Sequence, residues 1–478
     1  MPDLREALRA CLRQRGRGSL RRSLEDALQL ARLREWCRRA LADSHLVTVA
    51  ALLTDELRAT PADLEALGLA VDVLEAFPAW RRGSRRGFRP EPLGLTPARV
   101  GAEHPISTLR LQFSGESWMV PLALLLLREL PRCMDESTNF VVSVEPGANL
   151  ERLRGLLQRL DGRRAARCRI VELAAATLFA QDAARAARTR DGAAVLLVPR
   201  TFRVGEARAR DAVAESAAVS LGLRVVRSRA YWEGGNILND DASCFVGADT
   251  IAVNRARLGL TGSEVMTLLG ADLGVEIVTL GNAAAVRFDR DSGALVESGQ
   301  DSFHIDLDVA LLGRVGRRSR PTALIADPAR GLELVHHVLR RRSLFEGQFL
   351  PAKAVRAHVV AEYQADARAR FDRLVDYSAT LERCGYQVIG VPDLRIRQRA
   401  NLFGLVNLSF GYCNVLPGPW RGRPGVYYLP FGIAELDRAA EARYRRAGCE
   451  PVRVSRNARI ANELRRLSGG LHCACGSL

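Results

Sequence analysis

A cysteine close to the carboxyl end of the sequence is the first candidate for chemistry. Cys473 follows Gly469, Gly470, Leu471 and His472. Glycine lets the backbone bend without a clash at Cβ, so the thiol can be directed into a pocket rather than packed into a core. Together with a histidine and several carboxylates found upstream, such a thiol has the partners needed to attack a guanidinium carbon.

The sequence around Cys473 leaves three interpretations open. The residue is a nucleophile, an inert thiol, or a metal ligand together with His472 and Cys475, because His-Cys-x-Cys supplies nitrogen and sulfur ligands. The chain has no second His/Cys pair at ligand spacing, so a closed zinc site would need distant, single partners. We therefore expect no metal.

Ionisable residues alternate with apolar ones in the segment 303–309. If this segment is a strand, His304, Asp306 and Asp308 lie on one face, since side chains alternate between the faces of a strand. Three ionisable groups on one face indicate either a functional site or an edge strand whose polar face is in water. The segment alone does not decide between these two interpretations.

A second glycine pair lies in the middle of the chain. Glu233, Gly234, Gly235 and Asn236 follow an aromatic pair. Two glycines permit a close approach of the backbone to a ligand, or a turn with positive φ. The alternative is a β-turn with a capping asparagine.

Short apolar strands alternate with helices from about residue 105 onward, which predicts an α/β domain. The expected strands are 140–144, 168–173, 194–199, 225–226, 251–253, 276–279, 387–391 and 426–429. The expected helices are 149–160, 212–221, 264–269, most of 345–385, and 434–447.

The first part of the chain has a different character. Residues 1–80 show helical spacing of apolar residues, with a helix start at Thr60 and Pro61, and predict an all-helical N-terminal extension. Residues 81–104 are rich in arginine, glycine and proline and predict a linker. The catalytic α/β domain is expected to span 105–478.

Composition excludes several classes of protein. The chain has 478 residues, of which 47% are hydrophobic, so it is globular rather than disordered. No apolar stretch approaches the roughly 20 residues needed to cross a membrane, and no signal peptide is evident. We expect a cytoplasmic protein whose ten cysteines are free thiols. The net charge of +16 comes almost entirely from arginine, since Lys353 is the one lysine, and we do not read it as a nucleic-acid site.

Three motifs together resemble the guanidino-group-modifying (pentein) superfamily. They are Glu-Gly-Gly-Asn at 233–236, His-x-Asp at 304–306 and Gly-Gly-x-His-Cys at 469–473, and they occur in the order of that family. The family includes arginine, agmatine and peptidylarginine deiminases, dimethylarginine hydrolases and amidinotransferases. The segment from Asn414 to Cys473 also resembles the C-terminal part of peptidylarginine deiminases. The resemblance implies a pseudo-fivefold α/β propeller over about 105–478.

The resemblance also implies catalytic roles. Cys473 would attack the guanidinium carbon as a thiolate, and His304 would protonate the departing amine and then activate water. Glu233 would hydrogen-bond His304 and favour its imidazolium form. No metal or organic cofactor is required.

Substrate-binding roles follow from the same resemblance. Asp306 and an upstream acid would hold the guanidinium between carboxylates. Asp182 is the better match for the upstream acid, and Asp191 is the rival. The remaining substrate-binding positions are Gly234, Gly235 and Asn236.

The function implied is that of a deiminase, which converts a guanidine to a ureido group and ammonia. The alternatives are an amidinotransferase that uses the same thiol intermediate, and a non-catalytic, nucleic-acid-binding member of the fold. The substrate would be a small-molecule or peptidyl guanidine. The N-terminal segment could bind a protein substrate, form a homodimer or cover the site, and the sequence does not choose among these.

Overall fold

The computed structural model describes residues 88–113, 120–172, 179–200, 204–288, 295–316, 320–341, 353–396, 409–466 and 469–477. The helical extension predicted for 1–80 and the first part of the expected linker lie outside these residues. Within the described ranges, no helix combines the length and the apolar character needed to cross a membrane.

One unit of secondary structure recurs along the chain. It consists of two antiparallel strands, a helical connection, and a third strand parallel to the second. In one such unit, β5 (Arg185–Thr189) and β6 (Ala194–Arg200) are antiparallel, and β7 (Arg224–Tyr231) lies parallel to β6 after α11 (Val204–Leu221). The helix is required because parallel neighbours cannot be joined by a tight turn.

Three further units have the same order. The antiparallel pairs are β8 (Ile237–Asn239) with β9 (Cys244–Gly247), β13 (Val309–Gly313) with β14 (Thr322–Asp327), and β17 (Leu416–Pro417) with β18 (Gly425–Tyr428). The connecting helices are α12 (Ala248–Leu258), α13 (Gly262–Leu273), α14 (Pro328–Arg341), α15 (Lys353–Arg383) and α16 (Ala434–Arg446). The parallel third strands are β10 (Ile277–Leu280), β15 (Gln387–Leu394) and β19 (Glu450–Arg453).

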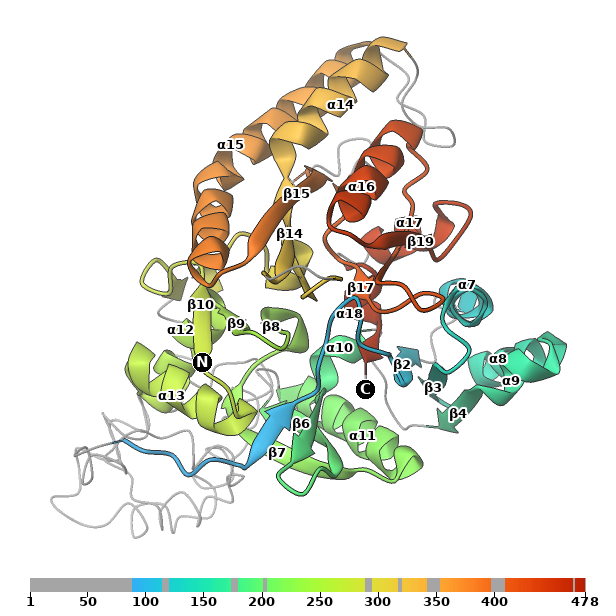
Figure 1. Cartoon of the computed structure of the whole chain (residues 1–478), viewed down its shortest axis with the longest axis vertical. Helices are drawn as coiled ribbons and strands as arrows, with labels where there is room; N and C mark the ends of the chain where they lie inside the picture. The colour runs from blue at the N-terminus through green and yellow to red at the C-terminus, as the bar shows by residue number, and fades with distance from the viewer. Residues whose placement is uncertain are drawn as a thin grey trace, which may run out of the picture.

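The remaining unit joins the two ends of the domain. The last strand, β20 (Gly476–Ser477), pairs antiparallel with β2 (Thr108–Phe113). After β2 come α7 (Val120–Cys133) and β3 (Asn139–Val144), which lies parallel to β2. The units surround the short helix α18 (Leu471–Ala474) in Figure 1. This closed α/β arrangement agrees with the pseudo-fivefold fold expected from the sequence.

Additional strands and helices extend the units. β1 (Leu95–Pro97) pairs with β5, so part of the segment expected to be a linker contributes to a sheet. The other additions are β4 (Cys168–Glu172) beside β3, β16 (Phe410–Gly411) beside β15, the hairpin of β11 (Arg287–Phe288) and β12 (Leu295–Glu297), and the helices α8 (Ala148–Arg159) and α9 (Gly162–Ala166).

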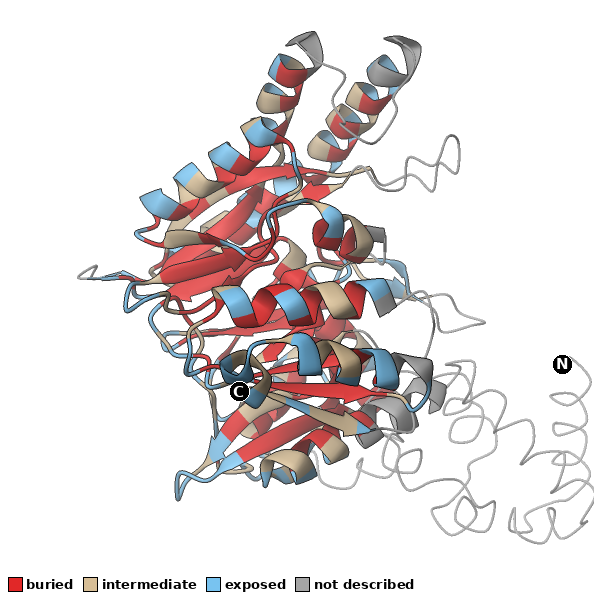
Figure 2. Cartoon of the chain, turned by 90° about the vertical axis from the view of Figure 1, so that its right-hand side faces the viewer, coloured by how far each residue is buried: buried red, intermediate tan, exposed pale blue. Residues whose placement is uncertain are grey.

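The sheets lie inside the molecule and the helices outside. In Figure 2 the strands are mostly buried, while the outer helices alternate between buried and exposed residues, as amphipathic helices do. The described residues form separate apolar clusters, of which the largest packs β13, β14 and β15 against α15 and α16.

Two predicted elements are wrong, while the other strands and helices predicted within the described ranges coincide with elements of the same type, although α11 and β7 are longer than expected. The expected strand 251–253 lies inside α12, because a short apolar run does not by itself distinguish a strand from a buried helix. The expected strand 303–309 is a 3-10 turn, η5 (Ile305–Leu307), followed by β13. The polar residues of this segment have different partners. His304 and Asp306 face Glu233 and Cys473, while Asp308 pairs with Arg370.

The partner of Asp308 is a buried cluster of charges centred on Arg370 of α15. The guanidinium is fully buried, with Nε 2.5 Å from Asp301 and Nη2 3.1 Å from Asp308, and it also pairs with Asp366 and Asp393. Asp308 in turn accepts hydrogen bonds from the backbone and hydroxyl of Ser302 at 3.0 and 2.9 Å. The cluster thereby ties together both ends of the loop 301–308.

Removing this arginine should destabilise the protein strongly. We expect Arg370→Ala to lower the free energy of unfolding by about 3–5 kcal/mol, because it leaves buried aspartates without their cation. Chemical denaturation measures the change. Arg368→Ala, on an exposed position of the same helix, is the matched control and should stay within about 0.5 kcal/mol of wild type. Equal effects of the two substitutions would contradict the structural role assigned to the cluster.

Candidate active site

Five short segments meet at the centre of the ring, and each precedes the first strand of one unit. They are α10 (Ala180–Ala183) before β5, η4 (Gly234–Asn236) before β8, η5 before β13, residues 413–415 before β17, and α18 before β20. α10 contacts both η4 and α18, and η4 contacts η5. The repeated topology therefore brings together side chains that are far apart in the sequence.

The sulfur of Cys473 lies between an amide and a carboxylate. Asn414 Nδ2 donates to Sγ at 3.1 Å, and the two carboxylate oxygens of Asp306 lie 3.5 and 3.8 Å from Sγ. Asn414 Oδ1 accepts from the backbone N–H groups of His472 and Cys473 at 2.8 and 3.2 Å. One asparagine thus fixes both the start of α18 and the position of the thiol.

The imidazole of His304 lies between two carboxylates. Nε2 is 2.8 Å from Glu233 Oε2, and Nδ1 is 3.8 Å from Asp182 Oδ1. Burial favours the neutral ring, but the charge of Asp182 and the hydrogen bond and charge of Glu233 outweigh it and raise the pKa of His304 to about 9. The ring is therefore an imidazolium at neutral pH.

The thiol has an environment opposite to the one that usually activates cysteine. Burial raises the pKa of Cys473 well above its ordinary value, and the charges of Asp306 and Asp182 raise it further. Without a bound cation the sulfur is therefore protonated.

Asp182, and not its rival, belongs to the cluster. Its carboxylate is buried and accepts a hydrogen bond from the backbone N–H of Gly235 at 3.2 Å. Asp191 lies in the exposed turn between β5 and β6, where it bonds Thr189. The structure therefore brings Asp182 together with Glu233 and His304.

The glycines of both motifs allow close packing within the site. A Cβ on Gly234 would lie 1.8 Å from the carbonyl oxygen of Gln181, and one on Gly235 would lie 2.5 Å from His304 Nδ1. A Cβ on Gly470 would lie 2.5 Å from Asn414 Oδ1. Gly234 and Gly235 thus make room for α10 and the imidazole, and their expected contact with substrate stays a prediction.

Asn236 supports the loop that carries His304. Its Nδ2 donates to the carbonyl of Phe303 at 3.0 Å, and its Oδ1 accepts from Gln300 Nε2 at 2.7 Å and from the N–H of Ile305 at 3.3 Å. These bonds hold the side chain inside the protein, and the substrate contact expected from the sequence stays a prediction. Gln300, which the sequence analysis did not single out, completes this support.

Two other residues of the site have contacts with the thiol or its carboxylate partner that the sequence did not predict. His472 Nδ1 lies 2.7 Å from Asp306 Oδ2, the carboxylate oxygen that is also the nearer one to the sulfur, so a second imidazole holds this carboxylate beside the thiol. The sequence named Asn414 only as the first residue of the segment that resembles peptidylarginine deiminases, and it predicted no role for the side chain. A polar residue within a mostly apolar segment that precedes a strand is the signal that could have identified it.

A metal ion is a competing occupant of the centre. Ligand atoms of His304, Asp306 and Cys473 all lie within 4.8 Å of one another. Binding through this set requires a neutral imidazole and a thiolate, and the surrounding carboxylates favour the protonated forms of both. Cys475, the other sulfur considered for a metal, is buried instead in an apolar cluster with Leu109 and Leu471.

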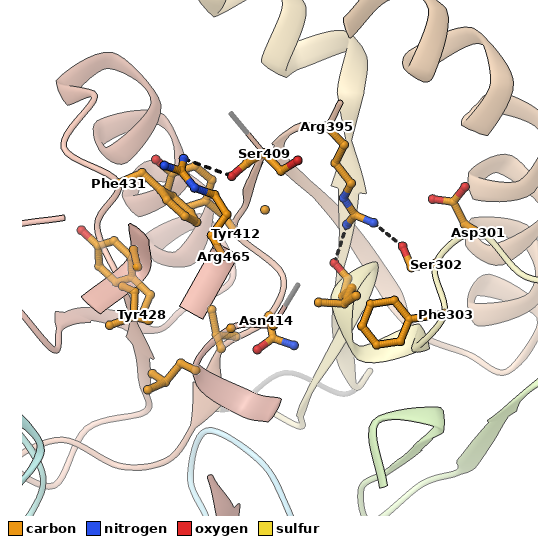
Figure 3. Close-up of a pocket in the computed structure, with 18 of the residues that line it drawn as sticks. Asp301, Ser302, Phe303, Arg395, Ser409, Tyr412, Asn414, Tyr428, Phe431 and Arg465 are labelled. Carbon is orange, nitrogen blue, oxygen red and sulfur yellow. Dashed lines mark hydrogen bonds between the residues drawn. The ribbon is translucent and has the colours of Figure 1, made fainter. Parts of the chain in front are cut away.

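A cavity of about 400 Å³ is lined by residues that neighbour His304 and Cys473. Phe303, Asn414 and Gly470 line it, and behind them lie the imidazole and the thiol, both buried. The ring of Phe303 stacks on His304 with centroids 4.6 Å apart and is half exposed. Figure 3 shows Asn414 and Phe303 at one end of the cavity, with Arg465 and Arg395 on opposite sides above them.

Solved structures with the same fold include deiminases. An agmatine deiminase of C. jejuni has 13% sequence identity and a TM-score of 0.50, over 80% of this chain and 96% of that chain. A structure described as that of a candidate agmatine deiminase also has 13% identity and a TM-score of 0.50, over 80% and 97% of the two chains.

These matches confirm the α/β fold that the sequence predicts. At such low identity they show the fold and no more. No family model matches the sequence, and no curated protein matches it.

The charge state of His304 can be measured directly. We expect NMR titration to give a pKa of about 9, and Glu233→Gln to lower it, because the substitution removes the charge that favours the imidazolium. Glu333→Gln, an exposed carboxylate of α14, is the control and should leave the titration unchanged. A wild-type pKa near the ordinary value of about 6.5 would contradict this electrostatic account.

The raised pKa of His304 also makes the free energy of unfolding depend on pH. The folded-state pKa of His304 lies above the unfolded value, so its contribution to the free energy of unfolding is complete below about pH 6.5. That contribution is lost as the pH rises through about 9.

Proposed function

We propose that the chain is a deiminase that hydrolyses a guanidino group to a ureido group and ammonia through a covalent bond to Cys473. The observation that carries the proposal is the convergence of a thiol, an imidazolium and buried carboxylates at one point. Each has a task in this reaction, and the fold is one that deiminases use.

The carboxylates account for the choice of a guanidinium. Asp306 and Asp182 are buried, and both raise the pKa of the thiol, so the centre favours a bound cation. A guanidinium is planar and presents a fork of N–H donors that matches carboxylate oxygens. Held by Asp306, its carbon would lie beside the sulfur, which is 3.5 Å from that carboxylate.

The substrate itself would activate the nucleophile. A cation placed between the sulfur and the carboxylates offsets their charge and lowers the pKa of Cys473. The thiol proton is released to solvent, and the thiolate attacks the guanidinium carbon. Activation is then coupled to binding of the correct charge, which keeps the free thiol unreactive.

The first half of the reaction ends with loss of ammonia. Attack forms the bond between Sγ and the guanidinium carbon and gives a tetrahedral intermediate. His304, an imidazolium before reaction, protonates one nitrogen, and the bond from that nitrogen to carbon breaks. Ammonia leaves, a thiouronium remains on Cys473, and His304 becomes neutral.

The second half restores the protein. Neutral His304 takes a proton from water, which attacks the thiouronium carbon. The bond from carbon to Sγ breaks and the ureido product forms. His304 is again an imidazolium, the second proton returns to the thiolate, and the product carries no charge to hold it among the carboxylates.

Replacing the nucleophile should abolish turnover. We expect Cys473→Ala to lower kcat by on the order of a thousandfold or more. The measurement is colorimetry of ureido product with arginine, agmatine, methylated arginines and an arginyl peptide. Cys475→Ala is the matched control, since this thiol lies in an apolar cluster, and it should retain most of the activity. Equal loss in both variants, with metal found by elemental analysis, would instead favour a metal site.

The value of kcat/KM should increase with pH between about 7 and 9. Attack requires a thiolate together with an imidazolium, and the pKa of Cys473 lies well above its ordinary value while that of His304 is about 9. The reactive form is therefore a minority at pH 7, and kcat/KM should rise as the pH approaches about 9. A plateau from pH 6 to 8 in the pH profile would contradict this assignment.

A further inference from the structure

The side of α15 that faces away from the sheet carries apolar side chains that the domain does not cover. Phe371 is 63% exposed and Val375, one helical turn further on, is 50% exposed. Figure 1 shows α15 along the outer edge of the molecule, with α14 beside it. We propose that this side of α15 binds the same side of a second copy of the chain, with the two α15 helices antiparallel.

The exposed residues of α15 follow the spacing of a helix that packs against another helix. Ala361, Ala365, Arg368, Asp372 and Val375 are all exposed and are separated by alternating steps of four and three residues. This spacing places the side chains along one line of a helix, as in the contacts of a coiled coil. The two alanines are small, so a second helix could approach closely. These residues, together with Phe371, are the outer face of α15.

The outer face is complementary to itself when it is read in the reverse direction. In an antiparallel pair with a twofold axis, positions at equal distances on either side of the axis face each other. With the axis at the height of position 370, Arg368 faces Asp372 of the second copy, and Val375 faces Ala365 of the second copy. Phe371 then lies next to the axis, close to the same residue of the second copy.

The two charges at the centre of the outer face have no partners of their own. Neither Arg368 nor Asp372 forms an ion pair or a side-chain hydrogen bond with another of the described residues. Each would gain a partner of opposite charge in the antiparallel pair. Because exposed ion pairs contribute little energy, this pairing would determine the direction and register of the two helices more than their affinity.

A cavity of about 590 Å³ borders the outer face and would widen the contact. Phe371 and Val375 line it from α15, Leu332 lines it from α14, and Ile325 lines it from β14. In an antiparallel pair the cavities of both copies lie on the same side of the two helices, so the Phe371 rings could extend over them. An apolar surface of this kind is typical of a contact between proteins.

Charge also favours association through this face. The chain carries a net charge of +16, so two copies repel each other over most of their surface. Between positions 361 and 376, the exposed charged residues are Arg368, Asp372 and Asp376, so carboxylates outnumber cations there. Two copies can therefore approach through the outer face of α15 without bringing their positive charges together.

Sedimentation velocity of the full chain, measured at a series of concentrations, tests this inference. We expect an equilibrium between monomer and dimer. Val375→Asp should raise the dissociation constant of the dimer at least about tenfold, because it places a charge in the apolar contact. Val219→Asp, at an exposed position of α11, is the matched control and should leave the constant unchanged. Circular dichroism checks that both variants are folded.

An exchange of charges tests the antiparallel register. Arg368→Asp should weaken the dimer at least about fivefold, because it places carboxylates opposite each other. Adding Asp372→Arg restores the opposite charges and should return the dissociation constant to within about twofold of wild type. Adding Asp376→Arg instead is the control, since position 376 does not face position 368, and it should not restore the dimer.

Three results would overturn the inference. One is a monomer at every concentration, which is expected if another protein or another segment of the chain covers this face. The second is a dimer that Val375→Asp leaves intact, which would place the contact elsewhere. The third is failure of the exchange of Arg368 and Asp372 to restore association. None of these measurements involves a substrate, so the inference does not depend on the proposed function.

Discussion

The pairing of β20 with β2 is the constraint on which the site depends. It closes the ring by completing the unit that joins the two ends of the domain, in which β20 is the first strand and β2 the second. Because α18 directly precedes β20, closure places Cys473 at the centre, where α10, η4 and residues 413–415 also converge. A shift of this short strand would move the sulfur away from Asp306 and Asn414, and the cluster would lose its nucleophile.

Electrostatics at this centre are opposite to those of the chain as a whole. The sequence carries a net charge of +16, yet buried carboxylates surround the thiol and the imidazole. They hold His304 in its charged form and Cys473 in its neutral form, as seen in the raised pKa of each. A centre with surplus negative charge, closed off by Phe303 and Asn414, favours a small cation that arrives with its own hydrogen-bond donors.

The sequence was sufficient to predict the α/β architecture and most of the residues of the cluster. The three motifs taken together, and none of them alone, identified Cys473, His304 and Glu233, through their resemblance to a known family. It could not predict that η5 interrupts the expected strand 303–309, because Asp306 and Asp308 have different tertiary partners, one beside the thiol and one beside Arg370. It also could not predict the role of Asn414, whose bonds to α18 exist only once the ring is closed.

The most direct test of the account is mass spectrometry of protein quenched with acid during turnover of a guanidine. The account predicts an adduct on the peptide that contains Cys473, with the mass of the guanidine less that of ammonia. An amidinotransferase would instead leave only the amidino group on the same sulfur. Turnover without an adduct on Cys473, or with one on another cysteine, would contradict the claim that the thiol at the ring centre is the nucleophile.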